Sequence, residues 1–462
     1  MSFDTPGYVL FLCTAALLYR LCPRQLRRAL LLISSIFFYA CWSLPLTLVI
    51  ASVVLLTYVC AHGIQRAKSG AGRKLGLAAA VSGCVGLLIW FKYFNFLADA
   101  LASLAGGSWT PWIILLPVGC SFYTFQAMSY VIDVYRGRLP AVRHLGRYAL
   151  YICFFPQLVA GPIERADALL PQLTDAPDPT GEDTVRGLKL LLSGFFRKLV
   201  IADLSAPIVN RVFAMASPDG SAVFLGLLLF SFQIYCDFAG YSDIARGSAL
   251  LMGIRLRRNF DRPYLARTVR AFWRRWHMSL TAWFTDYVYI SLGGSRKGKG
   301  RQIAATLTVF LLSGLWHGTN WTFVAWGLYH GLLCVLEILL GRKEKETDGW
   351  QLSDWINWVV TGALVLFSWL LFRAESLGQA GSLLSCLFSR WDVQTGLAQA
   401  ALGWTEAACL TLALAQLSLL NRLSRRGKVP DIAYVFLTVC VLAAWFVRAA
   451  GHGAGVFIYF QF

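Results

Sequence analysis

Long apolar runs recur along the whole chain and are separated by short polar turns. The clearest runs cover residues 8–19, 29–41, 77–90, 222–232, 355–372 and 432–447. Such runs are typical of helices in a lipid bilayer, because about 20 apolar residues cross its hydrocarbon core. The pattern predicts an all-α, polytopic membrane protein with about ten to twelve transmembrane helices.

The composition agrees with the pattern. Of the 462 residues, 57% are hydrophobic and only 14% are charged, and the mean hydropathy is +0.58. A soluble globular domain carries about 25% charged residues, so this class is excluded. More spans follow directly after the first apolar run, and no small-residue cleavage site separates them. We therefore interpret residues 1–20 as a retained first helix and not as a signal peptide.

The net charge of +18 comes from basic residues in the short turns. Clusters of these residues stand at Arg20, Arg24, Arg27 and Arg28, at Arg66, Lys68, Arg73 and Lys74, at Arg136, Arg138, Arg143 and Arg147, and at Arg422, Arg425, Arg426 and Lys428. Basic turns face the cytoplasm, so the charge is explained without a nucleic-acid partner. The prediction is a multi-pass membrane protein with the N-terminus, residues 98–110 and residues 457–462 on the outer side.

Two stretches depart from the pattern of simple spans. Residues 148–165 combine proline, glycine and charge with a run too short to cross the bilayer, which predicts a re-entrant or buried broken helix. A surface loop between two spans is an equally open interpretation. Residues 175–183 are acidic, contain proline and are interpreted as an exposed loop. The twelve cysteines are scattered without the spacing of a zinc site, so we expect neither a metal nor a disulfide.

Residues 255–301 interleave arginines and lysines with aromatic residues. Aromatic residues favour the headgroup region of a bilayer and cations favour its cytoplasmic phosphates, so residues 266–290 are predicted to form interfacial helices. Contact with membrane lipid alone would explain these arginines. A second role is attraction of an anionic, phosphate-bearing substrate.

His317 is the strongest candidate for chemistry. It lies in the apolar stretch 303–340, sixteen positions after Arg301. On a continuous helix this separation is about 24 Å, which places the imidazole deep in the bilayer. A neutral buried imidazole accepts a proton from a hydroxyl, although a membrane histidine can also serve only to bond neighbouring helices. Gly318 permits a close approach, and Thr319 and Asn320 add polar groups where a packed span prefers apolar ones.

Two further groups are weaker candidates. His277 stands at the border of the basic, aromatic segment, where an anchoring role is common. A polar run at the end of the apolar stretch 222–232 contains Gln233, Tyr235, Asp237, Tyr241, Ser242 and Asp243. Carboxylates at membrane depth mark function by default, although Arg246 offers Asp243 a structural counter-ion. The chain has no P-loop, G-x-S-x-G or H-E-x-x-H motif, which argues against an ATPase, a common esterase and a zincin.

These residues lie in segments that resemble the membrane-bound O-acyltransferase (MBOAT) family, and within it the branch of bacterial alginate O-acetyltransferases, the AlgI-like branch. The segments are FPQLVAGPI at 155–163, QIYCDFAGYSD at 233–243, NF at 259–260, PYL at 263–265, FWRRWHMSL at 272–280, YISLGGS at 289–295, LWHG at 315–318 and FIYFQF at 457–462. They occur in the expected order from about residue 155 to the end. Ser291 stands where this branch usually has proline, which affects nothing catalytic.

The resemblance implies that His317 is the catalytic histidine and His277 a second functional histidine. It further implies a single domain over residues 1–462 in which helices surround a central funnel. Within it, residues 1–140 would be peripheral N-terminal spans, 145–340 the catalytic core and 355–462 C-terminal spans. The implied donor is a cytoplasmic acyl-CoA such as acetyl-CoA, with no permanently bound cofactor. The implied partners are an extracytoplasmic SGNH-type acetyltransferase and a surface polysaccharide.

The sequence therefore leads to a mechanistic hypothesis. Cationic side chains hold the donor phosphates, His317 takes the proton of an acceptor hydroxyl, and His277 or Asn320 orients or polarises the thioester. The predicted substrate-binding residues are Asn320, Trp316, Gln233, Tyr235, Asp237, Ser242, Asp243, Arg270, Arg274, Arg275 and Trp276, with Lys297 as a further cation. The alternatives are a transporter or lipid flippase, and a scaffold of an exopolysaccharide export complex. The acceptor polymer, the acyl length and the oligomeric state stay open.

Overall fold

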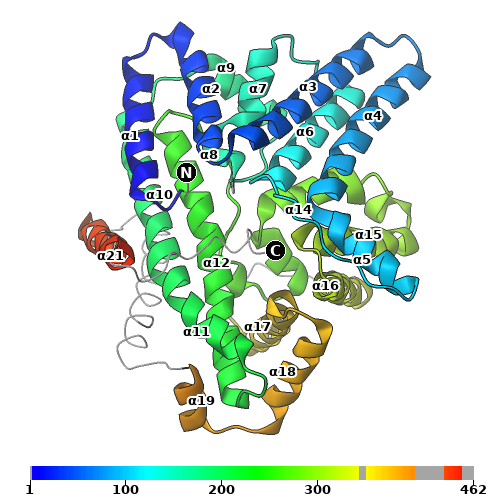
Figure 1. Cartoon of the computed structure of the whole chain (residues 1–462), viewed down its shortest axis with the longest axis vertical. Helices are drawn as coiled ribbons and strands as arrows, with labels where there is room; N and C mark the ends of the chain where they lie inside the picture. The colour runs from blue at the N-terminus through cyan, green and yellow to red at the C-terminus, as the bar shows by residue number, and fades with distance from the viewer. Residues whose placement is uncertain (1–2, 160, 343–349, 401–410, 412–430, 450–462) are drawn as a thin grey trace. The chain divides into compact units, whose positions relative to one another are not determined.

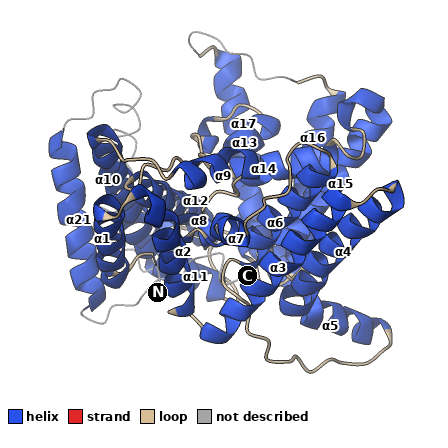
Figure 2. Cartoon of the chain, turned by 90° about the horizontal axis from the view of Figure 1, so that it is seen from above, coloured by secondary structure: helices blue, strands red, loops and turns tan. Residues whose placement is uncertain are grey.

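The computed structural model describes residues 3–159, 161–342, 350–400, 411 and 431–449. Figure 2 shows that this part of the chain consists of helices and loops and contains no strand. The predicted all-α class is confirmed. The chain divides into two compact units, of which unit 1 comprises residues 1–191 and 244–258 and unit 2 comprises residues 192–243 and 259–462.

The helices of unit 1 follow the predicted apolar runs with short turns between them (Figure 1). They are α1 (Pro6–Leu21), α2 (Arg24–Ala40), α3 (Leu44–Arg66), α4 (Gly70–Leu88), η1 (Ile89–Tyr93), α5 (Phe94–Leu104), α6 (Cys120–Tyr135), α7 (Leu145–Cys153), α8 (Phe155–Leu158), α9 (Ala166–Asp175) and most of α10 (Gly181–Phe195), together with the end of α12.

Unit 2 contains the remaining helices. They are η2 (Phe196–Ala202), α11 (Asp203–Ala214), most of α12 (Gly220–Leu250), η3 (Pro263–Leu265), α13 (Val269–Arg275), α14 (Met278–Phe284), η4 (Thr285–Tyr289), η5 (Gly294–Lys297), α15 (Lys299–His317), α16 (Trp321–Leu339), α17 (Leu352–Arg373), α18 (Leu377–Ser389), α19 (Val393–Ala400) and α21 (Asp431–Ala449).

Five helical stretches in the described part of the chain are long and apolar enough to cross a membrane. They cover 44–66, 70–104, 220–250, 321–339 and 352–373. Three shorter apolar helices cover 6–21, 377–389 and 433–446. Membrane character is thus confirmed, and the total of ten to twelve spans stays a prediction. The predicted basic turn at 422–428 and the predicted outer segment 457–462 lie outside the described residues.

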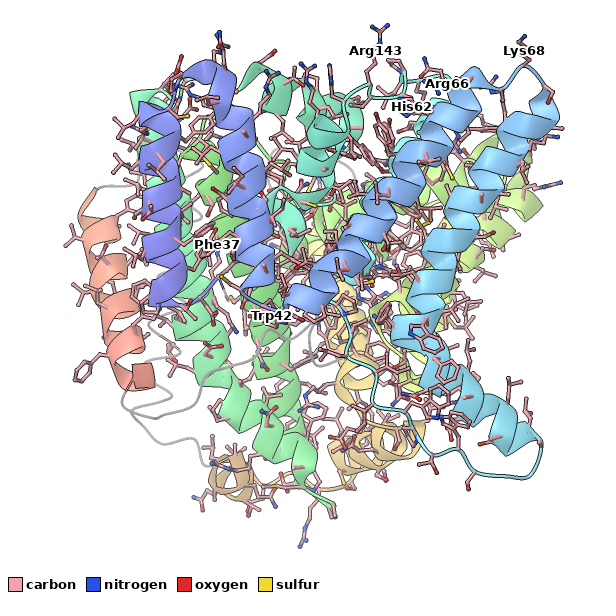
Figure 3. All side chains as sticks on the ribbon, turned by 45° about the horizontal axis from the view of Figure 1, so that its top comes forward. Phe37, Trp42, His62, Arg66, Lys68 and Arg143 are labelled. Carbon is pink, nitrogen blue, oxygen red and sulfur yellow. The ribbon has the colours of Figure 1, made fainter. Side chains whose placement is uncertain are left out.

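The basic turns of unit 1 lie at one end of its helices. The α1–α2 turn, the α3–α4 turn and the link between α6 and α7 meet there, and the α2–α3 turn with Trp42 lies toward the other end (Figures 1 and 3). This arrangement is the one that the charge pattern requires for a single cytoplasmic side. The assignment of that end to the cytoplasm stays a prediction.

The irregular segment 148–165 is a buried broken helix and not a surface loop. Proline stands early in the four-residue helix α8, and the chain then continues without regular structure to α9. Phe154, Phe155 and Gln157 are at most 2% exposed. The side-chain amide nitrogen of Gln157 donates to the carbonyl of Tyr151 at 2.8 Å, so a protein group satisfies this donor inside the segment. Whether the segment is re-entrant stays a prediction.

The basic, aromatic segment forms short helices as predicted, but its aromatic side chains lie inside the protein. Phe272, Trp273 and Trp276 are at most 7% exposed. The ring of Trp276 lies 5.0 Å from that of Trp369 on α17, measured between centroids. Other helices of unit 2 cover these rings, and the interfacial placement of the rest of the segment stays a prediction. The cation Arg274 stays exposed.

Candidate active site

His317 is the last residue of α15 and is 2% exposed. Gly318 follows in an extended conformation, and α16 begins three residues later at Trp321. Asn320 caps α16, since its side-chain oxygen accepts the amide of Thr322 at 3.1 Å. The predicted helix therefore does lead from the basic segment to His317, and it ends at this residue because two successive caps turn the chain back.

Aromatic rings enclose the imidazole of His317. The centroids of Trp316, Trp326 and Phe372 lie 4.9, 5.0 and 5.3 Å from it, each at a steep angle to its plane. All three side chains are at most 5% exposed. Burial among aromatic rings excludes bulk water and favours a neutral imidazole that can accept a proton.

A close crossing of α15 and α16 holds this arrangement in place. A Cβ atom on Gly314 would meet the carbonyl oxygen of Phe323 at 2.3 Å, and one on Gly327 would meet that of Phe310 at 2.4 Å. Only glycine permits such an approach of the two backbones, which is a common way for membrane helices to pack. The crossing lies one helical turn before His317 and fixes the position of the end of α15.

His277 connects α13 to α14 and is 1% exposed. Its φ of 42° lies in the left-handed region, which a non-glycine residue adopts only where its surroundings enforce it. The imidazole contacts Phe238 at 4.6 Å and Trp316 at 5.7 Å between centroids. Burial lowers the pKa of His277 to about 3, so the ring is neutral at physiological pH. The structure thus brings both predicted histidines into contact with Trp316.

A buried polar chain supports the backbone beside His277. The side-chain amide of Asn259 donates to the hydroxyl of Ser242 at 2.9 Å and accepts from that of Ser279 at 2.6 Å. The backbone carbonyl of Asn259 also accepts a hydrogen bond from the backbone amide of Met278 at 2.8 Å. Ser242, a predicted binding residue, therefore has a structural partner. The sequence did not predict this supporting position of Asn259, whose only signal was its place in a family segment.

The two carboxylates of the polar run form ion pairs with the π-helix η2. Lys198, which is 1% exposed on its side chain, lies 2.9 Å from Asp237 and 2.8 Å from Asp203. Arg197 pairs with Asp243. The structure shows Arg197 as a partner of Asp243, and the pairing of Asp243 with Arg246 that the sequence suggested stays a prediction. These pairs join α12 to η2 and give both carboxylates a structural role.

The other predicted residues of this run, Tyr235 and Gln233, are buried or half-buried, and Asn320 of the later segment makes structural contacts. Tyr235 packs edge-on against Phe260 and Tyr264, 5.6 Å from each, and lies 6.2 Å from Trp276. The side-chain oxygen of Gln233 is buried and has no hydrogen-bond partner within the described residues. Asn320 donates to the carbonyl of Glu375 at 2.6 Å in addition to its cap, so both ends of its amide are used in structural contacts.

Two of the four predicted donor-binding cations line one cavity of unit 2. Arg270 and Arg274 line a cavity of about 270 Å³, whose other end includes Ser313 on α15. The carboxylate of Glu337 on α16 accepts the backbone amides of Val269 and Arg270 at 2.7 and 3.0 Å. These bonds fix the backbone at Arg270, which lines the cavity. Arg275 and Lys297 do not line this cavity.

Taken together, the described part of the chain combines apolar helices of spanning length with two buried imidazoles that both contact Trp316. The membrane-bound O-acyltransferase family matches residues 139–356. A probable alginate O-acetylase AlgI of Pseudomonas putida is 37% identical over 406 residues, which are 86% of this chain and 82% of the relative. The same protein of Pseudomonas aeruginosa is 39% identical over 389 residues, or 82% of this chain and 73% of the relative.

A more distant relative has a different acceptor in its name. The peptidoglycan O-acetyltransferase of Helicobacter pylori is 30% identical over 413 residues, which cover 82% of this chain and 78% of the relative. The chain belongs to the membrane-bound O-acyltransferase family. It is a multi-pass membrane enzyme that transfers acyl groups, which decides against the transporter and the scaffold.

Proposed function

We propose that the enzyme transfers an acetyl group from cytoplasmic acetyl-CoA to an acceptor on the outer side of a bacterial inner membrane. The final acceptor is a hydroxyl group of a surface polysaccharide, reached directly or through an extracytoplasmic SGNH-type partner. The observation that carries this proposal is His317, a buried imidazole at the end of α15 in a chain of this family.

The donor cavity of unit 2 supports an acyl-CoA donor. Arg270 and Arg274 at one end supply positive charge for phosphates. The hydroxyls of Thr281, Thr285, Thr306 and Ser313 line the cavity and offer hydrogen bonds to the amides of a pantetheine arm. Ser313 stands four residues before His317 on one helix, which is about 6 Å of rise. A thioester at this end of the cavity would lie within a turn of the imidazole.

In the proposed step, the neutral imidazole of His317 takes the proton of the acceptor hydroxyl. The hydroxyl oxygen then attacks the thioester carbonyl, so that a C–O bond forms and the C–S bond breaks. The imidazolium returns its proton to the leaving thiolate. Carbonyl groups at the C-terminus of α15 favour this transient positive charge on His317. Trp316 separates the catalytic imidazole from His277, for which we propose a supporting role in orienting the thioester.

The names of the relatives support a glycan acceptor. Alginate and peptidoglycan both carry sugar hydroxyls, and the chain covers most of the length of each relative. A polymer is too large for the buried site around His317, which favours transfer through a smaller carrier or partner residue at the outer surface.

The test is transfer of radiolabelled acetyl from acetyl-CoA in membranes that contain the full chain, the purified glycan and its genetically linked partner. His317→Gln removes the base with little change in volume, and we expect label to fall by at least about 10²-fold. Leu312→Ala on the exposed side of the same helix is the matched control and should keep activity. Equal label from His317→Gln and the control would remove His317 as the base.

A second arm tests the donor cavity. Arg270→Gln with Arg274→Gln should raise the KM for acetyl-CoA and leave kcat nearly unchanged, because these cations bind parts of the donor that do not react. An unchanged KM would place the donor phosphates elsewhere.

A further inference from the structure

Unit 1 contains a pocket that none of the candidate catalytic residues lines. Its volume is about 1520 Å³, larger than the roughly 300–1,000 Å³ of most small-ligand sites. Its walls are the last turns of α3, the link 139–144, the start of α7 and the helix α9. Figure 3 shows His62, Arg66 and Arg143 together at this end of the unit, with Lys68 farther along at the turn to α4.

One wall of the pocket is cationic. It carries Arg66 from α3, Arg143 from the link and Arg147 from α7. None of these three guanidinium groups forms a hydrogen bond or an ion pair with another residue that the structure describes. Three such donors directed at one cavity provide a site for an oxyanion, and phosphate is the oxyanion that arginine binds in a bidentate manner.

The cationic wall is held in position by its backbone. The hydroxyl of Tyr58 donates to the carbonyl of Arg143 at 2.6 Å, and the side chain of Gln65 accepts the amide of Ala141 at 2.6 Å. At the start of α7, the N-cap residue His144 makes no capping bond with its side chain. The first amides of that nine-residue helix therefore add partial positive charge to the wall.

The opposite wall is acidic. It carries Asp167 and Asp175 from α9, whose carboxylates likewise have no hydrogen bond or ion pair with a described residue. Arginines and carboxylates that line one cavity usually pair with each other. Here, within the residues that the structure describes, no ion pair joins the lining arginines to the lining carboxylates, so the pocket presents separate cationic and acidic groups. A ligand with a phosphate at one point and an ammonium group at another matches this distribution.

The pocket also continues into a surface that faces lipid. Val59 lines it and is 64% exposed on α3, one of the apolar spans. Leu55 and Leu48 are 50% and 73% exposed on the same face of that helix, four and eleven residues before Val59. Leu170 and Pro171 add apolar surface on the α9 side. A ligand with alkyl chains fits this surface, whereas a wholly soluble phosphate compound would leave it uncovered.

We propose that this pocket binds the headgroup of a phospholipid that carries both a phosphate and a primary ammonium group. The phosphate contacts Arg66, Arg143 and Arg147, the ammonium contacts one of the two α9 carboxylates, Asp167 or Asp175, and the acyl chains lie along the exposed stripe of α3. The lipid would thereby join α3, α7 and α9 of unit 1. This site goes beyond the proposed acyl transfer and requires none of its residues.

The experiment uses the full chain, purified in detergent and freed of lipid, with bound lipid counted by native mass spectrometry. It is titrated with phosphatidylethanolamine, phosphatidylcholine and phosphatidylglycerol of identical acyl chains. We expect phosphatidylethanolamine to bind on the order of tenfold more tightly than either of the others, since choline has no N–H to donate and glycerol has no positive charge. Equal or tighter binding of phosphatidylglycerol would overturn the proposal.

Paired variants identify the two walls. Arg66→Gln with Arg143→Gln should weaken binding of phosphatidylethanolamine on the order of tenfold. Asp167→Asn with Asp175→Asn should remove its advantage over phosphatidylcholine. Lys68→Gln with Lys74→Gln is the matched control, because these exposed lysines of the same helical hairpin do not line the pocket. An equal loss from the control pair would show attraction by surface charge and overturn the site.

The source of the headgroup is tested by competition. Soluble glycerophosphoethanolamine at equal concentration should displace little of the lipid, because it lacks the chains that lie against α3. Full displacement would overturn the lipid in favour of a soluble ligand with the same charges. All readings are of binding, so loss of acetyl transfer in any variant neither supports nor contradicts them.

Discussion

Gly318→Ala gives the sharpest test of how the site around His317 is built. Gly318 has φ −160° and ψ 168°, an extended conformation that alanine adopts without strain. The added methyl group would nevertheless stand 2.0 to 2.7 Å from three ring atoms of Phe323. Phe323 is 4% exposed and packs edge-on against Phe372 at 5.0 Å, and Phe372 contacts His317 at 5.3 Å. The methyl group therefore acts on the imidazole through two rings.

The expected magnitudes follow from this chain of contacts. Inserting a methyl group into a closed core costs about 1–3 kcal/mol of stability, and a displacement of about 1 Å at a reacting group costs about 10²-fold in rate. We expect acetyl transfer to fall about 10²-fold while the protein still folds. Transfer of label from acetyl-CoA and thermal unfolding in detergent measure the two effects separately.

A matched substitution and a second-site change complete the design. Gly362→Ala is the control, because a Cβ at this glycine of α17 meets nothing within 4 Å, and it should leave both readings unchanged. Phe323→Leu in the Gly318→Ala background makes room for the methyl group and should restore part of the activity. Wild-type transfer by Gly318→Ala, or no recovery in the double variant despite normal folding, would refute this account of the site.

Three further outcomes are expected. Lys198→Met should lower stability by about 3–5 kcal/mol, measured as a lower melting temperature, because it leaves Asp237 buried without its cation. Adding Asp237→Leu should recover part of this loss. An unchanged melting temperature in the single variant would contradict the buried pair. Asn320→Ala should lower the stability of the protein by about 1 kcal/mol, because the cap of α16 is lost, and should reduce acetyl transfer less than tenfold. A loss of transfer of about 10²-fold at an unchanged melting temperature would instead show that Asn320 acts on the thioester. Burial raises the pKa of Glu164 from 4.5 to about 7, so the folded state binds this proton more tightly than the unfolded state. The resulting contribution to stability is fully present below pH 4.5 and is lost as the pH rises to about 7. Glu164→Gln should therefore reduce the dependence of the melting temperature on pH over this range.

Much of the fold was predictable because lipid burial selects apolar residues directly. The runs 8–19 and 355–372 became α1 and α17 with boundaries only a few residues wider. The break after His317 was missed because 303–340 is apolar almost throughout. Its signals were a glycine followed two residues later by an asparagine, which are the residues that end one helix and cap the next.

Candidate site residues were predictable only where one residue type is out of place in its surroundings. His317 is buried, as its place in an apolar stretch suggested, whereas the burial of His277 and the contact of both imidazoles with Trp316 were not predicted. The partners of the carboxylates were not predictable, because Lys198 and Arg197 stand about 40 positions earlier and only the packing of η2 against α12 brings them together. The roles of the histidines in catalysis stay predictions until the variants are measured.

Under the role proposed for His277, its left-handed backbone sets stability against chemistry at a single position. Glycine or asparagine would relieve the conformational cost of φ 42°, which is about 1 kcal/mol or more for other residues. Neither can supply an imidazole. A lineage that lost its need for acyl transfer would therefore drift toward glycine or asparagine at position 277 and gain a more stable protein. A family member that keeps histidine at this position, despite the conformational cost, would indicate continuing selection for activity.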